Sequence, residues 1–147
     1  MKTSWNPTLY KSATNTGNVA LTGDAVLGID KFSKALIILT VSGKTMAGGA
    51  VADVWVQYSP NQGTTYDDIG HFAQITAGAI ADGVYVMVLN HGSAGIADRI
   101  VDDAATLAAN SVRNQPWGDR MRIKIVPATF NGTTDTITLA VTAWFFE

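Results

Sequence analysis

The fold is decided by residues 54–74, which read VWVQYSPNQGTTYDDIGHFAQ. Two runs of alternating apolar and polar residues flank a turn that contains Pro60, Asn61 and Gly63. Proline presets φ early in a turn, whereas Asn and Gly tolerate positive φ. The stretch therefore predicts a β-hairpin with Val51–Ser59 as its first arm and Asp67–Gln74 as its second.

The second arm of this hairpin does not alternate strictly, since its apolar members are Ile69, Phe72 and Ile75. An extra residue in one strand of an antiparallel pair shifts the alternation, so we expect a β-bulge near Gly70. In the first arm, Trp55 shares the polar face with Asp53 and Gln57, which directs it away from the core. Either a neighbouring loop or a partner molecule then covers this indole ring.

Short β-like runs separated by glycine-containing turns continue through the rest of the chain and predict an all-β fold. We expect one antiparallel β-sandwich or jelly-roll-like domain over residues 21–147, preceded by residues 1–20 as an extended arm or an edge strand. The alternative for residues 96–110 is a short helix, because apolar residues recur there at helical spacing. The further predicted strands are Leu36–Val41, Val84–Leu89, Asp119–Val126 and Thr136–Phe146.

Charge is sparse in this chain of 147 residues: charged residues make up 15% of it, against about 25% in an average soluble domain. Leu36–Val41 and Val84–Leu89 are apolar on both faces, although a sandwich strand normally buries only one. Their second faces need cover, which either residues 91–119 or another copy of the protein would supply. Together with the low charge, these strands favour a subunit contact.

Sites for catalysis, metals and cofactors have no support in the sequence. Cysteine is absent, and the two histidines, His71 and His91, lack metal-ligand spacing. The pairs Asp67-Asp68 and Asp102-Asp103 point to opposite faces of an extended strand and cannot act together across a cleft. The formal charge of −2 gives no basic field for nucleic acid, and no apolar run is long enough to span a membrane. We therefore predict a protein that is not an enzyme and has no cofactor.

Residues that could contact a partner fall into three groups. Trp5 and Tyr10 are aromatic residues in a polar N-terminal segment, and Trp144 and Phe146 add large apolar groups to the outer face of the last strand. Arg120, Arg122 and Lys124 form a cationic stripe on one strand face, which would meet either an acidic partner or carboxylates of a neighbouring strand. With Trp55, the candidate interface residues are Trp5, Tyr10, Trp55, Arg120, Arg122, Lys124, Trp144 and Phe146.

The turn at residues 59–66, SPNQGTTY, resembles the Asp-box hairpin of sialidase-like propellers, with Asn61 in place of its Asp and Tyr66 in place of its Trp. A propeller carries one such box in each blade, whereas this chain has one copy and is too short for that fold. The Asp-box motif stabilises a turn and is not a catalytic signature.

Residues 54–74, the stretch Leu107–Lys124 and the threonine-rich last strand together resemble small virion proteins of tailed bacteriophages, over roughly residues 30–147. The resemblance implies a β-sandwich or jelly-roll protein that decorates or cements the capsid, as a homotrimer bound to the major capsid protein. Such a protein is made in the host cytoplasm, in keeping with the absence of a signal-peptide core at the N-terminus. Related folds occur in tails, baseplates and head fibres. A carbohydrate-binding module, with Trp55, Tyr58 and Trp117 stacking on sugars, is the alternative from another functional class.

Overall fold

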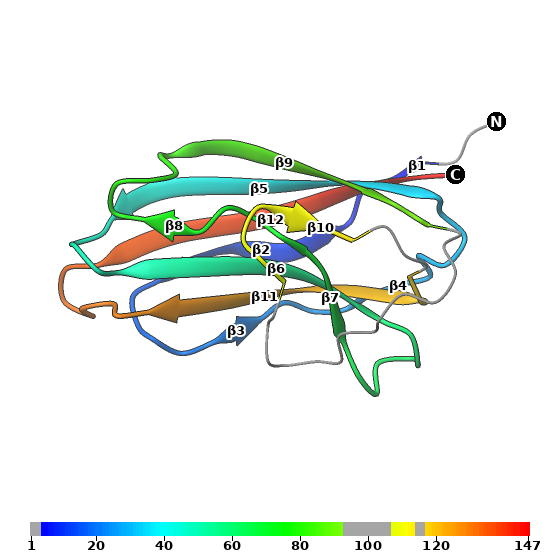
Figure 1. The fold of residues 1–147 in the computed structure, drawn as a ribbon, viewed down its shortest axis with the longest axis horizontal. Helices are drawn as coiled ribbons and strands as arrows, with labels where there is room; N and C mark the ends of the chain where they lie inside the picture. The colour runs from blue at the N-terminus through cyan, green and yellow to red at the C-terminus, as the bar shows by residue number, and fades with distance from the viewer. Residues whose placement is uncertain (1–3, 93–106, 114–116) are drawn as a thin grey trace.

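The computed structural model of the chain describes residues 4–92, 107–113 and 117–147, and these residues form two antiparallel β-sheets packed face to face (Figure 1). The all-β sandwich predicted from the sequence is confirmed, and no helix occurs in the described ranges. The strands are β1 (Ser4–Trp5), β2 (Thr8–Asn15), β3 (Leu21–Thr22), β4 (Val26–Leu27), β5 (Lys34–Thr45), β6 (Val51–Ser59), β7 (Asp67–His71), β8 (Ile75–Thr76), β9 (Gly83–Asn90), β10 (Ser111–Val112), β11 (Arg120–Ala128) and β12 (Thr136–Phe146).

The strand order is that of a jelly roll. Its strand pairs are nested in the sequence: strands near the two ends of the chain pair with each other, and strands near the middle pair with each other. Sheet A runs β1-β12-β5-β9, and β2 also pairs with β12. Sheet B runs β10-β7-β6-β11-β3, with β4 on β11 and β8 on β6. Thus β2 neighbours β12, the β3–β4 segment neighbours β11, β5 neighbours β9, and β6 neighbours β7. This nesting places the first and last long strands side by side in sheet A (Figure 1).

Strict alternation in the two longest C-terminal strands builds the centre of the core. In β11 and β12, buried residues alternate with half-buried ones and, at Trp144, with an exposed one, because successive side chains of a strand point to opposite faces. The inward rows are filled by branched and aromatic side chains that interdigitate between the sheets. They include Ile37, Leu39, Val54, Val56, Met121, Ile123, Ile125, Ile137, Leu139, Val141 and Phe145, all 1% exposed or less.

The hairpin predicted from residues 54–74 is present as β6 and β7, and the predicted bulge is confirmed. The register pairs Val56 with Gly70 and Gln57 with Asp68, which leaves Ile69 as the extra residue. In the turn, Gly63 has φ +88°, as expected, and the second positive φ of +58° belongs to Gln62. Asn61 acts through its side chain instead, because its Oδ1 accepts a hydrogen bond from the Thr65 amide at 2.8 Å.

Two other expectations concern segments at or beyond the sandwich edges. The short helix considered for residues 96–110 lies largely outside the described residues, and its described end, from Leu107 to Asn110, is a bend and turn before β10. Within the first twenty residues, β2 pairs with β12 from Ile137 to Thr142, so that this segment is part of sheet A.

Candidate interaction surface

The outer face of sheet A carries a row of apolar side chains that crosses three strands. Trp144 of β12 lies opposite Leu36 of β5, and Leu36 lies opposite Val88 of β9. Trp144 is 39% exposed and Val88 is 42% exposed, while Leu36 is half-buried between them. Ile38, half-buried on the next row of the same face, lies beside Val86. Single exposed apolar residues are ordinary, but a contiguous group on one sheet face is typical of a contact site. We call Leu36, Ile38, Val84, Val86, Val88 and Trp144 the sheet A patch.

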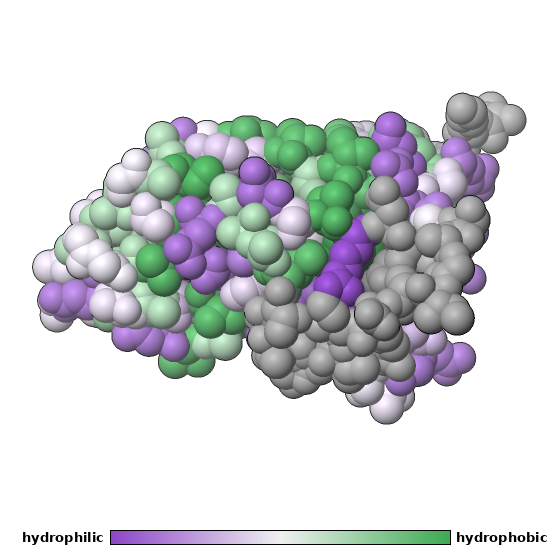
Figure 2. All heavy atoms as spheres, in the orientation of Figure 1, coloured by the Kyte–Doolittle hydropathy of each residue, from purple (hydrophilic) through white to green (hydrophobic). Residues whose placement is uncertain are grey.

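The valines of β9 are the most exposed members of the sheet A patch. Val84 is 63% exposed and Val86 is 55% exposed, and both point to the same side as Val88 because they are two residues apart. Met87 and Leu89 alternate with them and are buried in the core. Figure 2 shows the hydrophobic surface along the edge of the molecule where β9 lies. The prediction that this strand is apolar on both faces is confirmed, and its outer side chains remain exposed.

Trp5 and Phe146, two of the aromatic residues predicted as interface candidates, lie at the same end of sheet A. β1 pairs with the end of β12, with Trp5 opposite Phe145 and Ser4 opposite Phe146. The Trp5 ring lies 5.9 Å from the ring of Phe145 and 6.3 Å from that of Phe32, between centroids, and Trp5 is 38% exposed. Trp5 thus docks on its own domain and leaves one side open. Phe146 is half-buried, and Tyr10 is half-buried against the core.

Two members of the cationic stripe on β11, Arg120 and Arg122, make side-chain contacts within the chain. Arg122 donates from Nε to the Gln57 side-chain oxygen at 2.9 Å, and its guanidinium lies over the Tyr66 ring, 3.7 Å from the centroid. Arg120 pairs with the adjacent Asp119 at 3.4 Å, in a half-exposed position. Lys124 lies opposite Trp55 and is also half-buried. Arg122 thus has intramolecular partners, but these are an amide oxygen and an aromatic ring and not the carboxylates of a neighbouring strand considered from the sequence.

Trp55 points away from the core of the sandwich, as alternation predicts, but it is only 6% exposed. The imidazole of His71 stacks on its ring at a centroid distance of 4.2 Å. Of the two kinds of cover considered from the sequence, the structure thus shows one from within the chain, and little of the Trp55 ring is left open. Among the other proposed sugar-stacking residues, Tyr58 and Trp117 are also buried, at 5% and 4% exposed.

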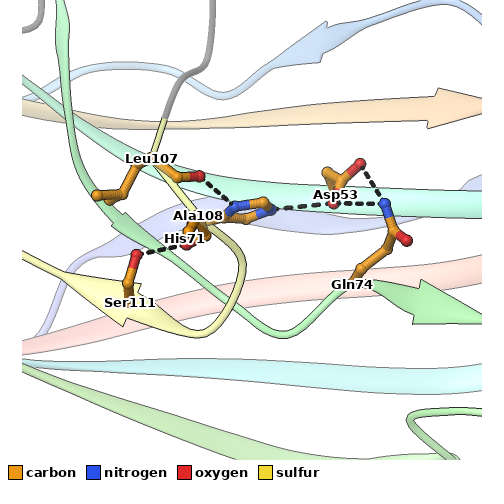
Figure 3. A network of polar contacts seen from close by, with 6 residues as sticks. All are labelled: Asp53, His71, Gln74, Leu107, Ala108 and Ser111. Carbon is orange, nitrogen blue, oxygen red and sulfur yellow. Dashed lines mark hydrogen bonds and ion pairs between the residues drawn. The ribbon is translucent and has the colours of Figure 1, made fainter.

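His71 is the centre of a polar cluster that the sequence did not reveal (Figure 3). Its Nδ1 lies 2.9 Å from the Leu107 carbonyl oxygen, and its Nε2 lies 3.0 Å from Asp53 Oδ1. The Gln74 amide donates to both carboxylate oxygens of Asp53, at 3.2 and 3.1 Å. The Ser111 hydroxyl donates to the Ala108 carbonyl and not to His71. The cluster thus ties the segment at Leu107 to β6 and β7, and among the residues drawn in Figure 3 no hydroxyl is hydrogen-bonded to the imidazole as an activated nucleophile would be.

Within the ranges that the structure describes, no three His, Asp or Glu side chains come close enough together to hold a metal ion. In the same ranges, no helix has the length and apolar character needed to cross a bilayer.

Comparison with known proteins gives a likeness of fold only. No family model matches the chain, and no curated protein matches it. Over 99% of its length, the chain superposes on a chain from the structure of infectious bursal disease virus, Gx strain, with a TM-score of 0.52 and 14% sequence identity. A chain from the Gt strain of the same virus is matched over 99% of this chain, with 14% identity and a TM-score of 0.39.

The chain spans about one third of the length of the Gx-strain chain, 33%, and 39% of the Gt-strain chain. At 14% identity, the first likeness shows a shared β-sandwich fold, and a TM-score of 0.39 adds no argument. Because unrelated functions recur on the same sandwich, function has to be argued from the surface.

Proposed function

We propose that this chain is a non-enzymatic structural protein of a virus particle, and that it decorates the head by docking the outer face of its sheet A onto the major capsid protein. The observation that carries the proposal is the sheet A patch, with Trp144, Leu36 and Val88 in one row across three strands. The patch lies on regular, paired strands of a rigid sandwich and therefore presents a preformed surface. Preformed surfaces lose little conformational entropy when they bind.

Burial of apolar area would favour binding through this face. Each Å² of apolar surface removed from water contributes about 25 cal/mol. Tryptophan is enriched at the centres of protein interfaces, and Trp144 stands at the end of the row with 39% of its surface exposed. The outer face also carries Thr138, Ala140 and Thr142, all half-buried and uncharged. Because these three side chains carry no charge, a partner that covers them does not have to remove water from a charged group.

The assignment to a virus particle draws on two further supports. Jelly-roll sandwiches are recurrent in viral capsid and lectin domains, and the fold is shared with a chain of a virus structure. The sequence resemblance to small virion proteins of tailed bacteriophages favours decoration of a phage head. The mechanism would be mass action: a protein that binds the assembled shell and not its dissociated subunits stabilises the shell.

Sugar binding is not favoured by this surface. Stacking on sugars requires exposed aromatic rings, whereas Trp55, Tyr58 and Trp117 are each 6% exposed or less. A position on a tail, baseplate or head fibre would use the same patch with a different partner. It is therefore an alternative outcome of the binding experiment.

The experiment uses heads assembled without this protein, from the virus whose genome encodes it. Purified protein should bind these heads saturably and raise the temperature at which they break open. Trp144→Lys should abolish binding, whereas Val19→Lys, a change at a 72% exposed residue outside the patch, should leave binding unchanged. If the protein does not bind heads but binds purified tails, its proposed location moves from the head to the tail. Equal binding by both variants would overturn the role of the patch.

A further inference from the structure

β9 is an edge strand that lacks the usual protection against pairing with another chain. In the described part of the chain it pairs on one side only, with β5, through eight register pairs from Lys34–Asn90 to Val41–Gly83 without a shift. Its sequence, GVYVMVLN, contains no charged residue and no proline. Natural edge strands are blunted by charge, proline, bulges or short length, because an open edge offers unpaired N–H and C=O groups to another strand.

The other sheet edges have such protection. β3, β4 and β10, which end sheet B, are two residues long each. β2, on the opposite edge of sheet A, carries Lys11, and its pairing with β12 is interrupted by two register shifts. Of the described edges, β9 therefore combines length, regularity and lack of charge. This combination indicates that another strand pairs with β9 in the functional, assembled state of the protein.

We infer that the partner strand is β9 of a second copy of this chain, paired antiparallel about a two-fold axis at Val86. A two-fold contact needs a surface that is complementary to itself. Residues 84–88 read VYVMV, with valine at the centre and at both symmetric positions. In this register Val86 faces Val86 of the second copy, and Val84 faces its Val88 on both sides of the axis. Cross-strand pairs of β-branched residues stabilise antiparallel sheets.

The ends of the paired strands are compatible as well. The same register places Asn90 opposite Asp82 of the second copy, so that an amide meets a carboxylate and no like charges meet. The Asp82 carboxylate is held in place by the Gly43 and Lys44 amides, at 2.9 and 3.1 Å. On the inner face, Tyr85 would lie opposite Met87 of the second copy, which joins two apolar side chains.

The pairing would make one continuous sheet from the two copies of sheet A and bring their two apolar patches onto the same face. Two linked patches on one rigid surface bind more tightly than either alone, because the second contact becomes intramolecular. The inferred pairing uses the backbone edge of β9 and three valines of the sheet A patch, and it does not require that the patch docks on a capsid, so it can hold without the proposed function. The inferred contact is two-fold, whereas the sequence resemblance implies a homotrimer.

Light scattering on the full chain is the first test. The protein should have twice the chain mass of 15.5 kDa, and Val86→Glu, which sets two carboxylates face to face at the axis, should reduce it to the mass of one chain. The matched control is Thr40→Glu, which adds the same charge to the same face one strand away from the edge, opposite Val84. Thr40→Glu should remain a dimer, since it does not lie at the edge. A monomeric wild-type protein at its highest soluble concentration, or a dimeric Val86→Glu variant, would overturn the inference.

Cysteine cross-linking tests the register and does not depend on disrupting the dimer. The natural chain has no cysteine, so a single introduced thiol can react only with its copy. Directly opposed residues in antiparallel strands have Cα atoms about 4.5–5.5 Å apart, within the range of a disulfide. Under mild oxidation, Val86→Cys should become almost fully cross-linked, whereas Val84→Cys should stay close to background because its copy lies about four residues along the strand. Equal cross-linking of the two variants would contradict the two-fold axis at Val86.

Discussion

The indole ring of Trp55 lies flat against the imidazole ring of His71, with centroids 4.2 Å apart and an angle of 24° between the planes. The stack closes the outer face of sheet B at the point where Asp53 and Leu107 hold the imidazole from both sides, and Gln74 in turn holds Asp53 (Figure 3). His71 thus serves as a cover for Trp55 and as a link between three segments of the chain.

Replacing His71 should separate these two roles. His71→Ala removes the ring and both hydrogen bonds and should lower the free energy of unfolding by about 1–3 kcal/mol, because the Leu107 carbonyl and Asp53 each lose the imidazole as a partner and Trp55 loses its cover. His71→Phe keeps an aromatic ring but not the hydrogen bonds. In that variant, the Trp55 indole N–H should stay protected from hydrogen exchange although stability falls. In His71→Ala the same N–H should exchange faster, as followed by NMR, and equal protection in both variants would mean that His71 does not cover Trp55.

Alternation along β6 predicts which way Trp55 points. The residue patterns along the individual strands also predict the boundaries of β6 and β12 and the bulge beside Gly70. These features depend on neighbours in sequence, and the period of two in a strand reports them directly. The cover over Trp55 depends on residues far along the chain, since Leu107 lies 36 residues after His71. No local pattern contains that contact. For the same reason, the sequence shows that Val84–Leu89 is apolar on both faces but not that this strand ends a sheet.

Gly118 should be the glycine least tolerant of substitution among those described. A Cβ at this position would lie 1.8 Å from the Ser59 carbonyl oxygen and 2.9 Å from Pro60 Cα, both backbone atoms that cannot rotate away. Gly118→Ala should therefore destabilise the protein by about 3 kcal/mol, measured by urea unfolding. Gly78→Ala is the control, because no atom lies within 4 Å of its Cβ position. A cost below about 0.5 kcal/mol for Gly118→Ala would show that the two segments do not pack this closely.

Arg122 should contribute to stability through its planar guanidinium. Lysine keeps the charge but cannot reproduce both the hydrogen bond to Gln57 and the stacking over Tyr66. We expect Arg122→Lys to cost about 1 kcal/mol in thermal or urea unfolding. Arg120→Lys should cost less than about 0.5 kcal/mol, because its ion pair with Asp119 is partly exposed to solvent. Equal costs for the two variants would argue against the stacked arrangement.

The turn at Asn61 should depend on a side-chain acceptor and not on the amide group. Asn61 Oδ1 accepts from the Thr65 backbone amide, and the Ser59 hydroxyl accepts from the Gly63 amide at 2.6 Å. Asn61→Asp keeps the acceptor and should leave the melting temperature almost unchanged. Asn61→Ala removes it and should cost about 1 kcal/mol. If both variants lose the same stability in parallel calorimetric scans, the Asp-box-like turn is not organised by this oxygen.

The central claim is that the protein binds a virus shell through the outer face of sheet A, and an electron cryo-microscopy map of the virus head with this protein bound tests it most directly. The map should show the sandwich on the outside of the head, with Leu36, Ile38 and Trp144 buried against the major capsid protein. A map in which this face is open to solvent and sheet B contacts the shell would contradict the claim, as would density for the protein on the tail alone.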